Sequence, residues 1–293
     1  MTLPARCWLF VPGDSERKIA KGLASDADAL ILDLEDAVAP ARRPAARELV
    51  AACLRAHPGA RLWVRINAPG SPQALADLAA VVPAAPAGIV LPKADGAADV
   101  VRLGHYLSAL EVAGGLAEGR TRIAVVATET PASLFALGGY APPPPRLAAL
   151  TWGAEDLAAA LGAAANREAD GAYAAPFTFA RTLCLAAAAA AGVAPIDTVF
   201  TDFRDTAGLA AEAAAARRAG FVGKLAIHPD QVGPINAAFT PTAAEVAAAR
   251  RVVAAFAAAP EMGTVGLDGR MLDRPHLTQA ERVLAAGARM GGR

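Results

Sequence analysis

The segment LAALTWGAED, Leu147–Asp156, contains a strand, a turn and the start of a helix in close succession. Its apolar first half, ending at Thr151, is typical of a buried strand. The Trp-Gly pair that follows favours a sharp turn, and the residues from Asp156 onward are typical of a helix start. Two adjacent carboxylates, Glu155 and Asp156, therefore lie where a strand ends and a helix begins. Such a carboxylate either stabilises the helix N-terminus by a few tenths of a kcal/mol to about 1 kcal/mol or belongs to a functional site.

An earlier segment ends in the same way, which favours the functional interpretation. The apolar run Arg122–Ala127 is followed by Thr-Glu-Thr-Pro, so Glu129 also lies at the carboxyl end of a strand. Two neighbouring strands that both end on a carboxylate can hold a hard divalent cation between them. The pattern therefore predicts a cation site at Glu129 and Asp156. The alternative for Glu129 is a solvated loop carboxylate.

The same strand–helix unit recurs along the chain at broadly even spacing. Apolar runs without polar alternation, which suit parallel strands covered on both faces, occur at Cys7–Val11, Ala29–Leu34, Arg61–Ile66, Gly88–Leu91, Arg122–Ala127, Leu147–Thr151, Ile196–Thr201 and Lys224–Ile227. Eight such units predict an α/β fold, a closed (β/α)₈ TIM barrel. The alternative, an open doubly wound sheet, requires a glycine-rich fingerprint after its first strand, and Pro12-Gly13-Asp14 is not one.

Polar side chains cluster at one end of the predicted strands. Those at or just beyond the carboxyl ends are Glu35, Asp36, Arg65, Asn67, Lys93, Glu129, Asp156, Asp202 and His228. In a barrel this face carries the active site, and residues distant in the sequence converge there. The pattern therefore predicts an active site at the carboxyl ends of the strands.

The barrel is complete before the chain ends. We therefore assign residues 1–235 to a catalytic barrel and residues 236–293 to a C-terminal helical extension. Within the extension we predict helices over Ala243–Ala258 and Thr278–Ala288, separated by the glycine-punctuated segment Gly263–Gly269. The extension is expected to be either a cap or an exchanged oligomer arm.

Composition excludes several classes of protein. Hydrophobic residues make up 55% and charged residues 19%, with a formal net charge of zero. Without a basic stripe, nucleic acid is not expected as a partner. The apolar runs are too short to span a membrane, and the first strand begins too early to leave room for a secretion signal, so we expect a cytoplasmic protein. Cys7, Cys53 and Cys184 lack metal-ligand spacing and are expected to be buried.

The chain resembles the HpcH/HpaI aldolase/citrate lyase family, in particular the CoA-ester lyases similar to the citrate lyase β subunit. The resemblance rests on LFVPGDSERKIAK (Leu9–Lys21), ALILDLEDAV (Ala29–Val38), WVRIN (Trp63–Asn67), VLPK (Val90–Lys93), TETP (Thr128–Pro131), WGAEDLAAALG (Trp152–Gly162), GFVGKLAIHPDQV (Gly220–Val232) and LDGRMLDRPH. It implies a (β/α)₈ barrel that binds Mg²⁺ and cleaves or forms a C–C bond next to an acyl-CoA thioester.

The resemblance also implies roles for individual residues. It makes Glu129 and Asp156 the Mg²⁺ ligands. Arg65 would bind the carboxylate or carbonyl oxygen of a 2-oxo acid, because a planar guanidinium holds carboxylate oxygens in pairs. The alternative for Arg65 is a rim ion pair with Glu35 or Asp36. Asp36 would support the metal's waters or orient Arg65.

Further basic residues have two interpretations each. Lys93 is either a further positive charge on the site, contacting substrate, or a structural ion pair. Arg17 and Lys21, at the start of the first helix, either bind CoA phosphates or belong to an ordinary solvated face. Lys224 and His228 match a Gly-Lys-x-x-Ile-His-Pro segment of the family, with roles on the CoA side or in the structure.

Asp273 in the extension matches an aspartate that, in the malyl-CoA and citramalyl-CoA lyase branches, acts as acid/base in a neighbouring subunit. Its alternative is a cap for the turn before Pro275. The resemblance implies a homotrimer or hexamer that cleaves or forms a β-hydroxyacyl-CoA, such as malyl-CoA, citramalyl-CoA or citryl-CoA, with acetyl-CoA and a 2-oxo acid as the other side of the reaction. Three alternatives are open: a CoA-independent metal-dependent aldolase, a malyl-CoA thioesterase, and a non-catalytic subunit that needs an acyl carrier protein.

Overall fold

The computed structural model describes residues 5–59 and 61–288. The chain divides into two compact units, one of residues 5–236 and one that contains the described residues 237–288. Among the described residues, every helix is too short or too polar to cross a lipid bilayer.

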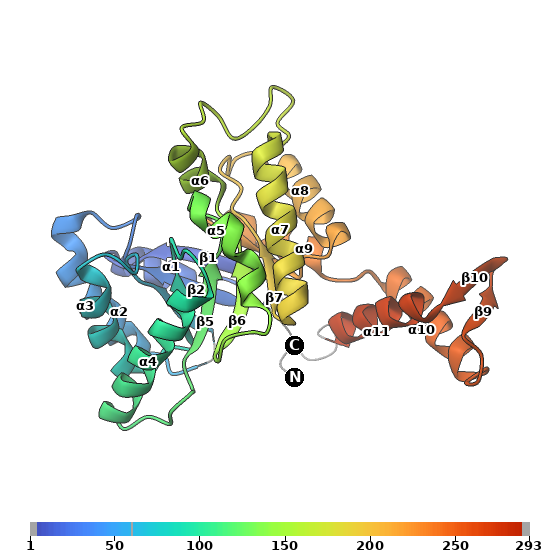
Figure 1. The fold of residues 1–293 in the computed structure, drawn as a ribbon, viewed down its shortest axis with the longest axis horizontal. Helices are drawn as coiled ribbons and strands as arrows, with labels where there is room; N and C mark the ends of the chain where they lie inside the picture. Colours follow the sequence, from blue (N-terminus) through green and yellow to red (C-terminus); the bar gives the residue numbers. More distant parts are fainter. Residues whose placement is uncertain (1–4, 60, 289–293) are drawn as a thin grey trace. The chain divides into compact units, whose positions relative to one another are not determined.

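The first unit is a closed barrel of eight parallel strands (Figure 1). Each strand pairs with the next in the chain, and β8 pairs with β1. The strands are β1 (Cys7–Pro12), β2 (Ala29–Asp33), β3 (Leu62–Arg65), β4 (Gly88–Leu91), β5 (Arg122–Val126), β6 (Leu147–Thr151), β7 (Ala194–Asp197) and β8 (Gly223–Ala226). The predicted (β/α)₈ barrel is therefore confirmed.

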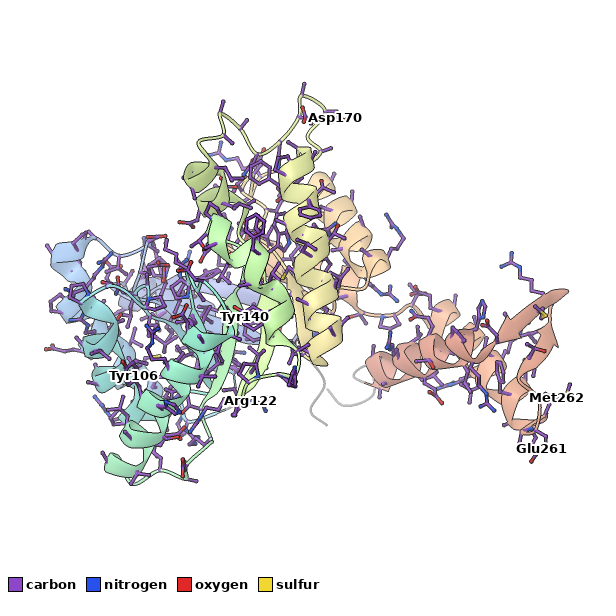
Figure 2. All side chains as sticks on the ribbon, viewed as in Figure 1. Tyr106, Arg122, Tyr140, Asp170, Glu261 and Met262 are labelled. Atoms are coloured by element: carbon purple, nitrogen blue, oxygen red, sulfur yellow. The ribbon has the colours of Figure 1, made fainter. Side chains whose placement is uncertain are left out.

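Helices surround the strands (Figure 1). The α-helices of this unit are α1 (Glu16–Leu23), α2 (Arg43–Ala56), α3 (Gln73–Val81), α4 (Ala97–Ala113), α5 (Pro131–Ala136), α6 (Ala154–Leu161), α7 (Ala175–Ala191), α8 (Thr206–Ala219) and α9 (Val232–Phe239), the last of which continues into the second unit. Short 3₁₀ helices lie at Pro40–Arg42, Val82–Ala84, Leu137–Tyr140 and Pro229–Gln231. Figure 2 shows Asp170 at the tip of the long loop that joins α6 to α7. Cys7, Cys53 and Cys184 are all buried and free, as predicted.

The barrel interior is filled by layers of side chains from alternate strands. Toward the carboxyl ends of the strands, the register gives the successive layers Trp8, Trp63, Ala124, Ile196; Ile31, Val90, Thr151, Leu225; and Phe10, Arg65, Val126, Thr198. The rings of Trp8 and Trp63 lie 4.8 Å apart. Gly88 makes room for them, because a Cβ there would lie 2.2 Å from the Trp63 ring. The third layer introduces Arg65, so the apolar filling stops just below the carboxyl ends.

The predicted end of the seventh strand was wrong. The strand stops at Asp197 instead of Thr201. The apolar residues that follow, such as Val199 and Phe200, lie in a loop and not in the strand. Asp202 therefore does not lie at a strand end. Its carboxylate accepts hydrogen bonds from the backbone N–H groups of Arg204 and Asp205, which is a local turn.

The second unit contains α10 (Ala243–Ala257), β9 (Thr264–Leu267), β10 (Arg270–Asp273) and α11 (Arg274–Gly287). The two strands form an antiparallel hairpin where a glycine-punctuated segment was predicted. Asp268 and Gly269 connect them with φ of 52° and 72°, as a type I′ turn requires. Figure 2 shows Glu261 and Met262 in the connection that precedes β9.

Candidate active site

Charged side chains converge at the carboxyl ends of β2 to β6. We call the following set the mouth cluster: Asp33, Glu35, Asp36, Arg65, Lys93, Glu129 and Asp156. Six of the seven were predicted to lie at this face, and the structure brings them into one network. The seventh, Asp33, was not among the predicted site residues.

Arg65, the last residue of β3, is held from two sides. Its Nε and Nη2 atoms donate to Oδ1 and Oδ2 of Asp33, both at 2.7 Å, and Nη1 lies 3.1 Å from Oε2 of Glu35. The guanidinium also packs 4.7 Å from the ring centroid of Phe10. Burial lowers the pKa of Arg65, but the carboxylates of Asp33 and Glu35 outweigh it and raise the pKa above its ordinary value. The site therefore holds a fixed positive charge with N–H groups to spare for a ligand.

The ion pair of Arg65 differs in part from the alternative given for this residue, a rim ion pair with Glu35 or Asp36. Glu35 does contact it, but Arg65 donates its paired hydrogen bonds to Asp33 at the end of β2. The predicted strand ran on to Leu34, which placed Asp33 inside it. The signal was present in the sequence, because Asp33 is the first carboxylate of the run LDLED.

Lys93 connects three carboxylates that follow two strands, β2 and β6. Its Nζ lies 2.7 Å from Oε1 of Glu35, 2.9 Å from Oδ2 of Asp36 and 3.2 Å from Oδ1 of Asp156. Burial lowers the pKa of Lys93, but the hydrogen bonds that it donates to Glu35 and Asp36 outweigh burial and raise the pKa well above its ordinary value. Its backbone has a positive φ of 49°, which is uncommon outside glycine and often marks functional sites.

Glu129, just after β5, is only 5% exposed. Its Oε2 accepts a hydrogen bond from the backbone N–H of Lys93 at 2.6 Å. Burial, together with the nearby charges of Asp156 and Glu35, raises the pKa of Glu129 to about 8. Gly153 allows the side chain to lie against the turn before α6, because a Cβ at Gly153 would be 2.7 Å from Cγ of Glu129.

These groups fit a hard divalent cation. A buried carboxylate whose charged form is disfavoured by burial and by neighbouring carboxylates gains stability from a nearby positive charge. Mg²⁺ is commonly held by one or two carboxylates while keeping several waters, which suits Glu129 and Asp156. Within residues 5–59 and 61–288, no three His, Cys, Asp or Glu side chains form a ready ligand set, and the ammonium of Lys93 lies among the carboxylates.

The residues predicted on the CoA side lie in different environments. Arg17 and Lys21 are exposed on α1 and, four residues apart, share one face of the helix. His228 is half-exposed after β8. Lys224 is fully buried, and its Nζ lies 2.9 Å from Oδ2 of Asp197 and 2.8 Å from Oε1 of Glu212 on α8. Lys224 is thus part of a structural ion-pair network.

That network also reaches the TWGAED segment, which the sequence did not reveal. Asp197 accepts hydrogen bonds from Nε1 of Trp152 at 2.8 Å and from Nε of Arg181 at 3.0 Å. Burial raises the pKa of Asp197, but the charges of Lys224 and Arg181 outweigh it and the pKa is lowered. The turn that carries Asp156 is therefore tied to β7 and β8.

Asp273 belongs to the second unit, where it ends β10 and precedes α11. Its carboxylate is half-exposed, with Oδ1 2.5 Å from Nδ1 of His276, and its backbone N–H donates to the same nitrogen at 3.2 Å. These contacts are compatible with the predicted cap at the start of α11 and leave the side chain accessible.

Comparison with known proteins identifies the family. The model of the HpcH/HpaI aldolase/citrate lyase family matches residues 6–229. The chain is 39% identical over 281 residues to a citrate lyase subunit beta-like protein of Mycobacterium tuberculosis, covering 94% of this chain and 93% of that protein. It is 34% identical over 288 residues to a (3S)-malyl-CoA thioesterase of Cereibacter sphaeroides, covering 96% and 94%.

A solved structure shows what one relative binds. The protein CitE of Mycobacterium tuberculosis, crystallised with magnesium, acetoacetate and coenzyme A, matches with a TM-score of 0.80 and 37% identity, covering 97% of this chain and 98% of that one. With the barrel, the mouth cluster and these matches taken together, the chain belongs to the HpcH/HpaI aldolase/citrate lyase family.

Proposed function

We propose that this protein is a Mg²⁺-dependent CoA-ester lyase. It cleaves or forms the C–C bond of a β-hydroxyacyl-CoA, such as malyl-CoA, citramalyl-CoA or citryl-CoA, with acetyl-CoA and a 2-oxo acid as the other partners of the reaction. The observation that carries this proposal is the position of the buried Arg65 guanidinium in the same cluster as the buried carboxylate of Glu129. An anion-binding group and a cation-binding group side by side suit a substrate that carries both a carboxylate and a reacting oxygen.

Glu129 and Asp156 are the proposed ligands of Mg²⁺. When bound, the cation polarises the substrate oxygen that is a hydroxyl on one side of the reaction and a carbonyl on the other. Arg65 binds the carboxylate of the 2-oxo acid with the N–H groups that Asp33 does not use. Because Asp33 and Glu35 fix the guanidinium before substrate arrives, little reorganisation is needed on binding.

Lys93 and Asp36 complete the electrostatics of the mouth cluster. The ammonium of Lys93 balances the carboxylates and contributes positive charge to the site. Its raised pKa keeps it protonated, so it is not the free amine that imine formation requires. Asp36 orients Lys93 through their 2.9 Å hydrogen bond and is proposed to hold water near the cation.

Asp273 is the proposed acid/base. In a homotrimer or hexamer, Asp273 of a neighbouring copy protonates the enolate carbon of acetyl-CoA after cleavage, or removes that proton in the condensation direction. Its carboxylate is half-exposed and therefore accessible to another copy. Arg17 and Lys21 are proposed to bind the phosphates of CoA, next to the start of α1.

Thioester hydrolysis is a second candidate, because the relative at 34% identity is a (3S)-malyl-CoA thioesterase. The two reactions share the first contacts with malyl-CoA and differ in their products. Cleavage of the C–C bond gives acetyl-CoA and glyoxylate, whereas hydrolysis gives malate and free CoA.

The test is Mg²⁺-dependent turnover of malyl-CoA, citramalyl-CoA and citryl-CoA, with separate detection of acetyl-CoA and free thiol. We expect acetyl-CoA from at least one thioester, loss of turnover in Glu129→Gln, and loss in Asp273→Asn. Asp268→Asn, on the same hairpin as Asp273, is the matched control and should stay active. Free thiol without acetyl-CoA would support the thioesterase. No turnover of any thioester by the isolated protein would favour the CoA-independent aldolase or the subunit that needs an acyl carrier protein.

A further inference from the structure

The loop that joins α6 to α7, residues 162–174, is folded back on itself. Arg167 and Tyr173 lie opposite each other as an antiparallel bridge, and the backbone N–H of Ala174 donates to the carbonyl oxygen of Asn166 at 3.0 Å. The guanidinium of Arg167 stacks on the ring of Tyr173, 3.8 Å from its centroid. The two arms of the α6–α7 loop are therefore joined through both the backbone and the side chains.

The α6–α7 loop contacts the segment that carries Asp156 at two points. The ring of Tyr173 packs edge-on against the ring of Trp152, with centroids 4.8 Å apart and ring planes at 71°. Nδ2 of Asn166 donates a hydrogen bond to Oε1 of Glu155 at 2.8 Å. Trp152 directly follows β6, and Glu155 directly precedes Asp156 in the first turn of α6. The loop therefore holds this segment at both of its ends.

Arg167 fastens the α6–α7 loop to the barrel. Its Nη2 donates to Oε2 of Glu212 on α8 at 2.8 Å, and Oε1 of Glu212 accepts from Nζ of Lys224 at 2.8 Å. Six side chains thus form a closed ring of contacts, in the order Trp152, Asp197, Lys224, Glu212, Arg167 and Tyr173. Arg167 joins the charged half of this ring, through Glu212, to its aromatic half, through Tyr173.

We propose that Arg167 is a positioning residue for Asp156. This inference rests on the proposed Mg²⁺ site and adds a residue that acts on the site without contacting metal or substrate. With Arg167 in place, the α6–α7 loop keeps the start of α6 in one position, so the carboxylate of Asp156 stays oriented toward the mouth cluster. A ligand group that is oriented in advance loses less conformational entropy when it binds a cation.

The coupling must act in both directions. If order in the α6–α7 loop strengthens Mg²⁺ binding, then bound Mg²⁺ stabilises the ordered loop by the same free energy. Mg²⁺ should therefore slow hydrogen exchange in a loop that supplies none of the proposed ligands. The backbone N–H of Ala174, which donates across the loop, is one reporter of this effect.

The first test is calorimetric binding of Mg²⁺ to the full chain. For Arg167→Met we expect about tenfold weaker binding. Loss of a positive charge would by itself strengthen the binding of a dication, so weaker binding is the sign of lost positioning and not of lost charge. Arg218→Met removes an exposed arginine from α8, the helix that carries Glu212, and should bind Mg²⁺ at least as tightly as the unaltered protein.

Tyr173 offers a second, matched pair of variants, which keeps the test decisive if Arg167→Met does not fold. Tyr173→Phe keeps the ring that packs against Trp152 and Arg167, so it should keep its affinity for Mg²⁺. Tyr173→Ala removes that ring and should bind Mg²⁺ about tenfold more weakly. Hydrogen exchange with and without saturating Mg²⁺ is the second readout. We expect Mg²⁺ to slow exchange in residues 166–174 of the unaltered protein and to have little effect there in Tyr173→Ala.

The outcomes separate the positioning role from the proposed function. Unchanged or tighter Mg²⁺ binding in Arg167→Met, with normal binding by the unaltered protein, would overturn the role of Arg167 and leave the proposed lyase intact. Loop exchange that is indifferent to Mg²⁺ would also overturn it, because the coupling would then be missing. Equal losses in Tyr173→Phe and Tyr173→Ala would contradict it too, since the ring would not be the cause. Failure of the unaltered protein to bind Mg²⁺ would overturn the proposed function and the positioning role together.

Discussion

Replacing Asp197 by asparagine is expected to destabilise the barrel by about 3 kcal/mol. Asp197 is 1% exposed and pairs with the fully buried ammonium of Lys224 at 2.9 Å. Asparagine keeps the shape of the side chain but removes its charge. Losing one partner of a buried ion pair costs about 3–5 kcal/mol, and the second contact of Lys224, with Glu212 at 2.8 Å, places the expected value at the lower end.

The assay is urea unfolding at neutral pH, followed by tryptophan fluorescence. All three tryptophans, Trp8, Trp63 and Trp152, lie in the barrel, so the signal reports on that unit. The double variant Asp197→Asn with Lys224→Met should lose less stability than the two single variants together, because the charge left behind is also removed. A loss below about 1 kcal/mol in Asp197→Asn, or strict additivity in the double variant, would refute the reasoning.

The same network has a functional consequence through Trp152. Trp152→Phe keeps an aromatic ring but removes the N–H that donates to Asp197. We expect a cost of about 1 kcal/mol in unfolding free energy. We also expect several-fold weaker Mg²⁺ binding in calorimetry, because this residue begins the turn that carries Asp156. Unchanged Mg²⁺ affinity would show that the turn is held by its other contacts.

Two further predictions concern pH and close packing. Burial raises the pKa of Glu111, but the paired hydrogen bonds of Arg146 outweigh it and hold the pKa at about 2, below the ordinary 4.5. Because the pKa of Glu111 is depressed in the folded state, its ionised carboxylate stabilises the fold above pH 4.5, and this stabilisation is lost as the pH falls toward 2. We therefore expect the free energy of unfolding in urea to fall by about 3 kcal/mol over this pH window. Glu111→Gln should not show this fall. Gly153→Ala should weaken Mg²⁺ binding and turnover at least tenfold, because the new Cβ displaces Glu129, while its φ of −118° is open to alanine.

The Gly153→Ala and Glu111→Gln experiments each have a matched control variant. Gly233→Ala adds a methyl group in α9 with nothing within 4 Å, so it should leave Mg²⁺ binding unchanged. For the acid window, Glu118→Gln changes an exposed carboxyl group of the neighbouring loop and should leave the pH profile in place. A Glu111→Gln profile that still falls between pH 4.5 and 2 would assign the acid sensitivity to other groups.

The fold could be predicted from the sequence because its signals are local. Each barrel strand is a short apolar run, and strand ends at Leu91 and Thr151 were predicted to the residue. The end of β7 could not be found in this way, since Phe200 is as apolar as the strand itself. The Asp268-Gly269 pair was a usable signal for the hairpin. The alternation of apolar and polar residues on either side of it was too weak for the two strands to be predicted.

The mouth cluster was predictable as a set, but its pairings were not. That Arg65 and Glu129 lie at one face follows from the position of strand ends alone. Arg65 forms its paired hydrogen bonds with Asp33 and not with Asp36. This choice depends on the register between β2 and β3, which places Asp33 directly opposite Arg65. The contact of Trp152 with Asp197 depends on how β6 and β7 lie side by side, and a single sequence carries no such information.

The charge balance of the mouth cluster has a consequence for the kinetics of the enzyme. Acidic side chains outnumber basic ones there by five to two. A 2-oxo acid or an acyl-CoA is itself an anion, so the bare mouth repels what it is proposed to bind. A dication reverses much of that repulsion. Binding is then expected to follow a compulsory order, with the metal ion entering first and the organic substrate second.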